Sequence, residues 1–131
     1  MGPSGRNAIK KKLPKIISEN KIDFSVINGE NAADDGKGIT KDIAEELFSL
    51  GIDVITSGNH IWDKQEITTY IETENRLLRP ANLAQGSPGR GYGIFSSKNK
   101  KFKIGVVNLM GNVFMRKTDD VFKIAKEICK R

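Results

Sequence analysis

Two short polar segments carry the side chains that are best suited to bind a metal ion or to move a proton. They are Asn28-Gly29-Glu30-Asn31 and Gly58-Asn59-His60. Glu30 has two carboxylate oxygens and could bridge two metal ions, while the amide oxygens of Asn31 and Asn59 could bind a metal without adding charge. With the imidazole of His60, these donors make a hard-to-borderline set of metal ligands.

Each of these residues also has an ordinary structural role open to it. Asn and Gly after a strand commonly form turns, so Asn28 and Asn31 taken alone are better explained as turn residues. Glu30 could be a solvated loop carboxylate. His60 is the only histidine in the chain, and a lone histidine is more often a surface group or a hydrogen-bonded group than a catalyst.

The two polar segments occupy equivalent places in a repeated strand–loop–helix pattern. Residues 24–27 and 53–56 are β-rich, and each run ends in one of the polar segments. Because strands joined by helices form parallel sheets, the sequence predicts an α/β fold. The carboxyl ends of parallel neighbouring strands meet at one edge of the sheet, which is where ligands collect in such folds. We therefore expect the two polar segments to converge.

The helices of the repeat carry recognisable boundaries. Thr40 is expected to cap a helix that Gly51 closes in the left-handed conformation. Asp63 and Glu66 resemble a capping box at the start of the next helix, and Trp62 is expected to pack beside the loop.

The outer parts of the chain have different patterns. A basic helix is expected over residues 6–21, with a kink or a late start caused by Pro14. The runs beginning at Phe95 and at Phe102 predict a hairpin. A last helix should follow a cap at Thr118 or Asp119, and one of its faces is apolar. That face consists of Val121, Ile124, Ala125 and Ile128.

Composition limits the class of protein. The net charge of +6 favours anionic partners such as phosphates or nucleic acids. Cys129 is the only cysteine, so no disulfide can form within the chain and a reducing cytoplasm is the expected location. No apolar run approaches the roughly 18 residues that span a bilayer, so no membrane association is predicted.

A non-catalytic module that binds RNA or another polyanion is the alternative function. It is supported by two groups of lysines, Lys10, Lys11, Lys12 and Lys15, and Lys98, Lys100, Lys101 and Lys103. Basic residues without interleaved exposed aromatics give weak, salt-sensitive binding, and such a module has no use for Glu30, Asn59 and His60.

Several longer segments resemble a known family. Gly58-Asn59-His60 is similar to the Gly-Asn-His block of the metallophosphoesterase superfamily. More specific segments closely resemble its YmdB-type branch, bacterial enzymes that hydrolyse 2′,3′-cyclic nucleotides. These segments are 27–33, 36–38, 58–63 and 78–82, and the resemblance continues through 107–111 and 119–120.

The resemblance implies an α/β sandwich, with a central β core flanked by helices, and a two-metal site. Glu30 would bridge two metal ions, for which iron is expected and manganese is the alternative. Asn31 would bind one metal and Asn59 the other, while His60 would donate a proton to the leaving oxygen. The implied substrate is a cyclic nucleotide or another small phosphodiester, and a homo-oligomer is compatible with this reading.

The resemblance also implies ligands that this chain does not contain. The family pattern has an aspartate that would precede Met1 and three further histidine ligands that would follow Arg131. We therefore expect residues 1–131 to form a single incomplete domain, truncated at both ends, that is inactive in isolation. A truncated pseudoenzyme that acts only through protein contacts is a further alternative.

Overall fold

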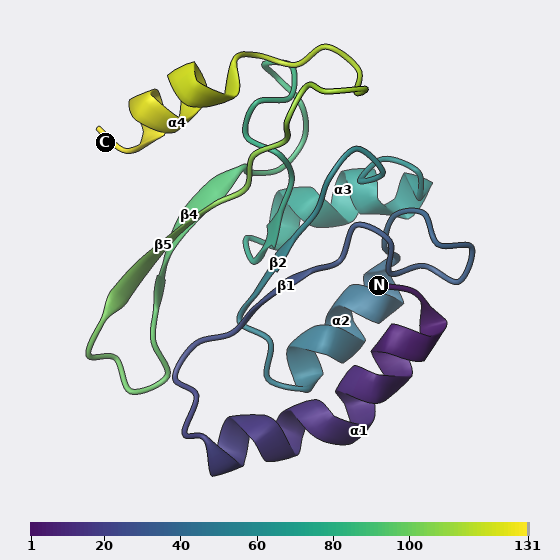
Figure 1. The fold of residues 1–131 in the computed structure, drawn as a ribbon, viewed down its shortest axis with the longest axis vertical. Helices are drawn as coiled ribbons and strands as arrows, with labels where there is room; N and C mark the ends of the chain where they lie inside the picture. The colour runs from purple at the N-terminus through teal and green to yellow at the C-terminus, as the bar shows by residue number, and fades with distance from the viewer. Residues whose placement is uncertain (131) are drawn as a thin grey trace.

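The computed structural model describes residues 1–130, so Arg131, the last residue of the expected domain, lies outside the described part. Four helices and five strands are assigned within it (Figure 1). In chain order they are α1 (Pro3–Glu19), β1 (Val26–Asn28), α2 (Lys41–Ser49), β2 (Val54–Thr56), α3 (Gln65–Thr73), β3 (Leu77–Leu78), β4 (Tyr92–Ser96), β5 (Lys103–Val107) and α4 (Val121–Ile128).

A parallel sheet with the strand order β1-β2-β3 is the centre of the fold, which confirms the predicted α/β class. Right-handed crossovers between sequential parallel strands place α2 and α3 on the same face of this sheet. Their buried side chains, including Leu47, Ile67 and Ile71, pack with Ile55 and Leu77 of the strands into one hydrophobic core.

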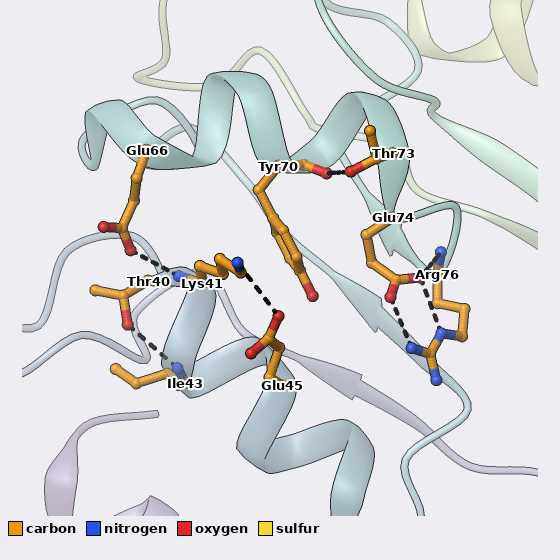
Figure 2. A network of polar contacts seen from close by, with 9 residues as sticks. All are labelled: Thr40, Lys41, Ile43, Glu45, Glu66, Tyr70, Thr73, Glu74 and Arg76. Atoms are coloured by element: carbon orange, nitrogen blue, oxygen red, sulfur yellow. Dashed lines mark hydrogen bonds and ion pairs between the residues drawn. The ribbon is translucent and has the colours of Figure 1, made fainter.

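The boundaries of α2 follow the prediction at both ends. The Thr40 hydroxyl accepts a hydrogen bond from the Ile43 N–H at 3.2 Å, and Gly51 has a φ of +99° just after the helix. Glu66, which projects from α3, adds a second cap because its carboxylate accepts the Lys41 N–H at 2.7 Å (Figure 2). This contact joins the first turn of α2 to the neighbouring helix.

The predicted capping box at the start of α3 is wrong. The helix begins at Gln65, and the residue at its cap position, Lys64, makes no side-chain capping bond. The two expected capping groups have other partners: the Asp63 carboxylate contacts the His60 ring, and that of Glu66 bonds to α2. The spacing of Asp63 and Glu66 matches a capping box, but contacts with His60 and with α2 engage the two carboxylates instead.

Helix α1 begins at Pro3, well before Pro14, so the predicted late start is wrong. Proline is favoured in the first turn of a helix, where its missing N–H has no partner to lose. Pro14 lies inside the helix, whose axis visibly bends along its length (Figure 1). The bend agrees with the predicted kink, because an interior proline removes one helical hydrogen bond. Ile9 and Leu13 pack against the core.

The last third of the described chain forms the predicted hairpin and the predicted terminal helix. Strands β4 and β5 are antiparallel, with Tyr92 opposite Val107 and Ser96 opposite Lys103. Helix α4 is capped by Asp120, whose carboxylate accepts the Lys123 N–H at 2.7 Å, and not by Thr118 or Asp119. Within residues 1–130, no helix combines the length and the apolar character needed to cross a bilayer.

Candidate active site

The two polar segments meet at the carboxyl edge of the sheet, as the sequence predicted. Asn28 lies opposite Thr56 in the parallel register of β1 and β2. The Gly29 N–H continues the ladder by donating to the Thr56 carbonyl at 2.8 Å. Residues 30–31 and 58–60 therefore leave the sheet side by side.

Glu30 is held directly against the second segment. Its Oε1 atom accepts the Asn59 N–H at 3.0 Å. A Cβ atom built on Gly58 would lie only 2.3 Å from the Glu30 Cδ and Oε1 atoms. The carboxylate thus occupies the space that any other residue at position 58 would fill, which is the physical reason for glycine in the Gly-Asn-His segment.

The asparagines of the first segment have different environments. The Asn28 side chain accepts the Glu30 N–H at 3.1 Å, so the turn interpretation of Asn28 is confirmed. Asn31 is exposed and forms an isolated backbone bridge with Gly38. Gly38 has a φ of +75°, and a Cβ there would lie 2.8 Å from the His60 carbonyl oxygen. The loop 34–38 therefore passes close to His60.

This loop is also fixed to the start of α3. The Lys64 ammonium contacts the Asp35 carboxylate at 2.6 Å, and this hydrogen bond holds the pKa of Asp35 below its ordinary value of 3.8. Lys37, in the same loop, is exposed.

The Asp63 carboxylate, which the sequence suggested as a helix cap, orients the His60 ring instead. The His60 Nδ1 atom lies 2.7 Å from the Asp63 Oδ2 atom. Because this contact engages Nδ1, the ring nitrogen available for proton transfer to a ligand is Nε2. The His60 side chain is 30% exposed, so a small molecule can reach it.

A cavity of about 390 Å³ opens beside this histidine. It is lined by Asn59, His60, Trp62, Asp63, Phe114, Met115 and Arg116. Trp62 packs partly against the core, as predicted, and also reaches this cavity. Gly86, in the glycine-rich segment 86–93, lines a different cavity, together with Arg79 and Asp119.

Two buried asparagines connect the site to the C-terminal part of the chain. The Asn108 amide donates to the Ser57 and Leu78 carbonyls, both at 2.9 Å. Asn82 is fully buried, donates to the Met110 carbonyl and accepts the Met110 N–H. Their roles could not be read from the sequence, because their partners lie about 30 to 50 residues away.

Glu30, Asn31 and Asn59 fit part of a metal site. They offer one carboxylate and two amide oxygens, donors that suit hard and borderline cations. Because Gly58 has no side chain, the Glu30 carboxylate lies directly against it, and this packing gives the ligand a defined position. Among residues 1–130, no group of three or more His, Cys, Asp or Glu side chains could hold a metal ion.

Acidic partners already engage part of the basic surface that suggested polyanion binding. Lys10 contacts Glu46 at 2.5 Å, and Lys15 contacts Glu19 at 3.6 Å. Lys98 lies 3.8 Å from the Asp53 carboxylate. These contacts lower the net positive field that the lysines offer to a polyanion.

The chain is similar to known proteins over nearly its whole length. The chain is 42% identical over 128 residues to a 2′,3′-cyclic-nucleotide 2′-phosphodiesterase of Bacillus subtilis, covering 98% of this chain and 47% of that protein. It is 34% identical to a putative phosphatase/phosphodiesterase of Mycoplasma pneumoniae, covering 97% of this chain and 46% of the relative. The chain thus spans about half the length of the curated relatives that it matches.

Solved structures show the same fold. A hypothetical protein from Thermus thermophilus superimposes with a TM-score of 0.90 at 32% identity, covering all of this chain and 50% of that one. A novel phosphatase from Mycoplasma pneumoniae gives a TM-score of 0.85 at 34% identity, covering 99% of this chain and 48% of that one. A family model described as YmdB-like protein matches residues 1–131. The chain therefore belongs to the YmdB-like protein family.

Proposed function

We propose that this chain supplies part of the active site of a metal-dependent phosphodiesterase that hydrolyses 2′,3′-cyclic nucleotides. The observation that carries the proposal is the contact of Glu30 with Gly58 and Asn59, immediately beside the oriented imidazole of His60. The substrate class is supported by the name of the Bacillus subtilis relative. Polyanion binding is not proposed, because acidic side chains engage several of the lysines.

The proposed ligands of this chain are Glu30, which would bridge two metal ions, and Asn31 and Asn59, which would each bind one. Metal ions held there, iron or manganese, would bind the phosphate oxygens and acidify the attacking water. Three ligand residues are few for two metal ions that each take about six ligands. We therefore expect the remaining ligands to come from residues outside this chain, and we expect little hydrolysis by the 131-residue chain alone.

His60 is proposed as the general acid. When water adds to phosphorus, the bond from phosphorus to one ribose oxygen breaks, and that oxygen needs a proton. The Nε2 atom of the imidazolium would donate it, while the Asp63 carboxylate holds Nδ1 and fixes the orientation of the ring. Asn59 and His60 are adjacent, so their side chains can serve the metal and the substrate separately.

The test compares hydrolysis of two substrates that differ in their leaving groups. It uses an enzyme of the relatives' length that carries this chain. His60→Ala should slow hydrolysis of a 2′,3′-cyclic nucleotide by about 10²–10⁴-fold, the usual contribution of a positioned general acid. A nitrophenyl phosphodiester has a leaving group that needs little protonation, so most of this defect should disappear. Asn59→Ala, the control, should slow both substrates. Equal defects of His60→Ala on both substrates would contradict the assignment.

A further inference from the structure

The segment 113–116 displays three apolar side chains beside the candidate active site. Val113 is 78% exposed, Phe114 is fully exposed and Met115 is 36% exposed. Phe114 also has a φ of +58°, in the left-handed region that bulky residues rarely adopt. Exposing an aromatic ring and straining its backbone are both unfavourable, and strained residues cluster at ligand-binding sites.

The surrounding structure holds this segment in place. The Asn112 side chain accepts the Thr118 N–H at 3.2 Å, and the Met115 N–H donates to the Asn112 carbonyl at 3.4 Å. The amide of buried Asn82 donates to the Met110 carbonyl just before the segment and to the Thr118 hydroxyl just after it. Both ends of the segment are therefore anchored to the body of the domain.

The segment forms one wall of the cavity that contains the histidine. Phe114, Met115 and Arg116 line it together with His60 and Trp62. The volume of about 390 Å³ lies within the roughly 300–1,000 Å³ typical of small-molecule sites. Within residues 1–130, no ion pair engages Arg116. The cavity thus combines an aromatic and apolar wall, an unpaired cation and a proton donor.

We propose that Phe114 forms the base-binding subsite, stacking on the nucleobase of a nucleotide whose phosphate lies between His60 and Arg116. This proposal rests on the function proposed above and adds a determinant of substrate choice. A nucleotide is the occupant that matches the wall, because its base is a flat π-face and its phosphate is an anion. A purely apolar partner would leave the Arg116 charge unmatched.

Trp62 makes the subsite directly measurable. It is the only tryptophan in the chain and it lines the cavity, so its fluorescence reports occupancy. We would titrate the 131-residue chain with adenosine 2′,3′-cyclic phosphate, with methyl riboside 2′,3′-cyclic phosphate, which lacks the base, and with adenosine. Phe114→Ala and Phe114→Tyr test the ring. Phe122→Ala is the matched control, because Phe122 is 82% exposed on α4 and does not line the cavity.

The cyclic nucleotide should quench Trp62 saturably and bind more tightly than the base-free compound. Phe114→Ala should weaken nucleotide binding about 5- to 150-fold, the usual effect of losing one base–aromatic stack, and leave base-free binding unchanged. Phe114→Tyr and Phe122→Ala should bind the nucleotide like the wild type.

The failures separate the two proposals. Equal binding of both cyclic phosphates, unaffected by Phe114→Ala, would overturn the base subsite and leave the phosphodiesterase proposal standing. Binding of adenosine that depends on Phe114 and equals that of the cyclic nucleotide would support the base subsite and overturn the phosphate position between His60 and Arg116; the phosphodiesterase proposal is tested separately by the leaving-group comparison. No saturable quenching by any of the three ligands would overturn the subsite.

Discussion

Replacing Gly58 with alanine should disturb Glu30 and little else. The new methyl group would lie 2.3 Å from the Glu30 Cδ and Oε1 atoms and 2.6 Å from Oε2, whereas carbon atoms in favourable contact are about 3.5–4.0 Å apart. Gly58 does not have a positive φ, so alanine is compatible with the backbone. The carboxylate is the end of a flexible side chain and should swing away, which breaks its 3.0 Å hydrogen bond with the Asn59 N–H.

The expected cost is therefore that of one hydrogen bond, about 1 kcal/mol. Gly105→Ala is the matched control, because a Cβ at Gly105 meets nothing within 4 Å and its φ is also not positive. It measures the effect of alanine on the unfolded chain, which any Gly→Ala change includes. Gly58→Ala should thus be less stable than Gly105→Ala by about 1 kcal/mol.

Urea unfolding followed by Trp62 fluorescence would measure these free energies. The decisive comparison is a double-mutant cycle, because Glu30→Ala removes the group that the new methyl would strike. Gly58→Ala should cost about 1 kcal/mol in the wild type and nearly nothing in the Glu30→Ala background. An equal cost in both backgrounds would mean that the Glu30 carboxylate does not occupy the space beside Gly58.

Three further predictions concern single side chains. Asp63→Asn, in an enzyme of the relatives' length, should lower kcat more than it changes KM, because the Asp63 carboxylate holds the Nδ1 atom of His60 and so orients the proposed general acid; steady-state kinetics would detect the split. Thr40→Ala should destabilise the chain by about 1 kcal/mol in urea unfolding, because α2 loses its N-cap. The hydrogen bond from Arg76 holds the pKa of Glu74 below its ordinary value of 4.5. The pair should therefore stabilise the fold above that pH and lose its effect as the pH falls through the lowered pKa, so wild-type and Glu74→Gln unfolding curves should converge in acid.

The contacts that could be predicted from the sequence are those that follow from the strand topology or from neighbouring residues. The convergence of Glu30 with Asn59 required only two parallel strands with polar carboxyl ends. The cap at Thr40 involves residues three apart, so it was visible locally. The capping prediction at Asp63 was wrong although it also rested on neighbouring residues. The Asp63 carboxylate can reach either a helix terminus or His60, and sequence spacing alone does not decide between these two partners.

Contacts between distant segments were beyond the sequence. Nothing local in Phe114 indicates that its segment lies beside His60, more than 50 residues earlier in the chain. Asn82, singled out only as part of a family-like segment, is a buried anchor whose partners lie 28 to 37 residues away. Strand β3 was not anticipated either, since two residues are too few to show the period of a strand.

The binding of manganese to the 131-residue chain tests the assigned ligands most directly. Free Mn²⁺ can be counted by its electron paramagnetic resonance signal, in a titration to millimolar concentration because the ligand set is incomplete. We expect weak binding that Glu30→Ala reduces further, by about 10-fold or more, and that His60→Ala leaves unchanged. Glu30→Ala binding Mn²⁺ as well as the wild type, or His60→Ala abolishing binding, would contradict the assignment of Glu30 as a ligand and His60 as the acid.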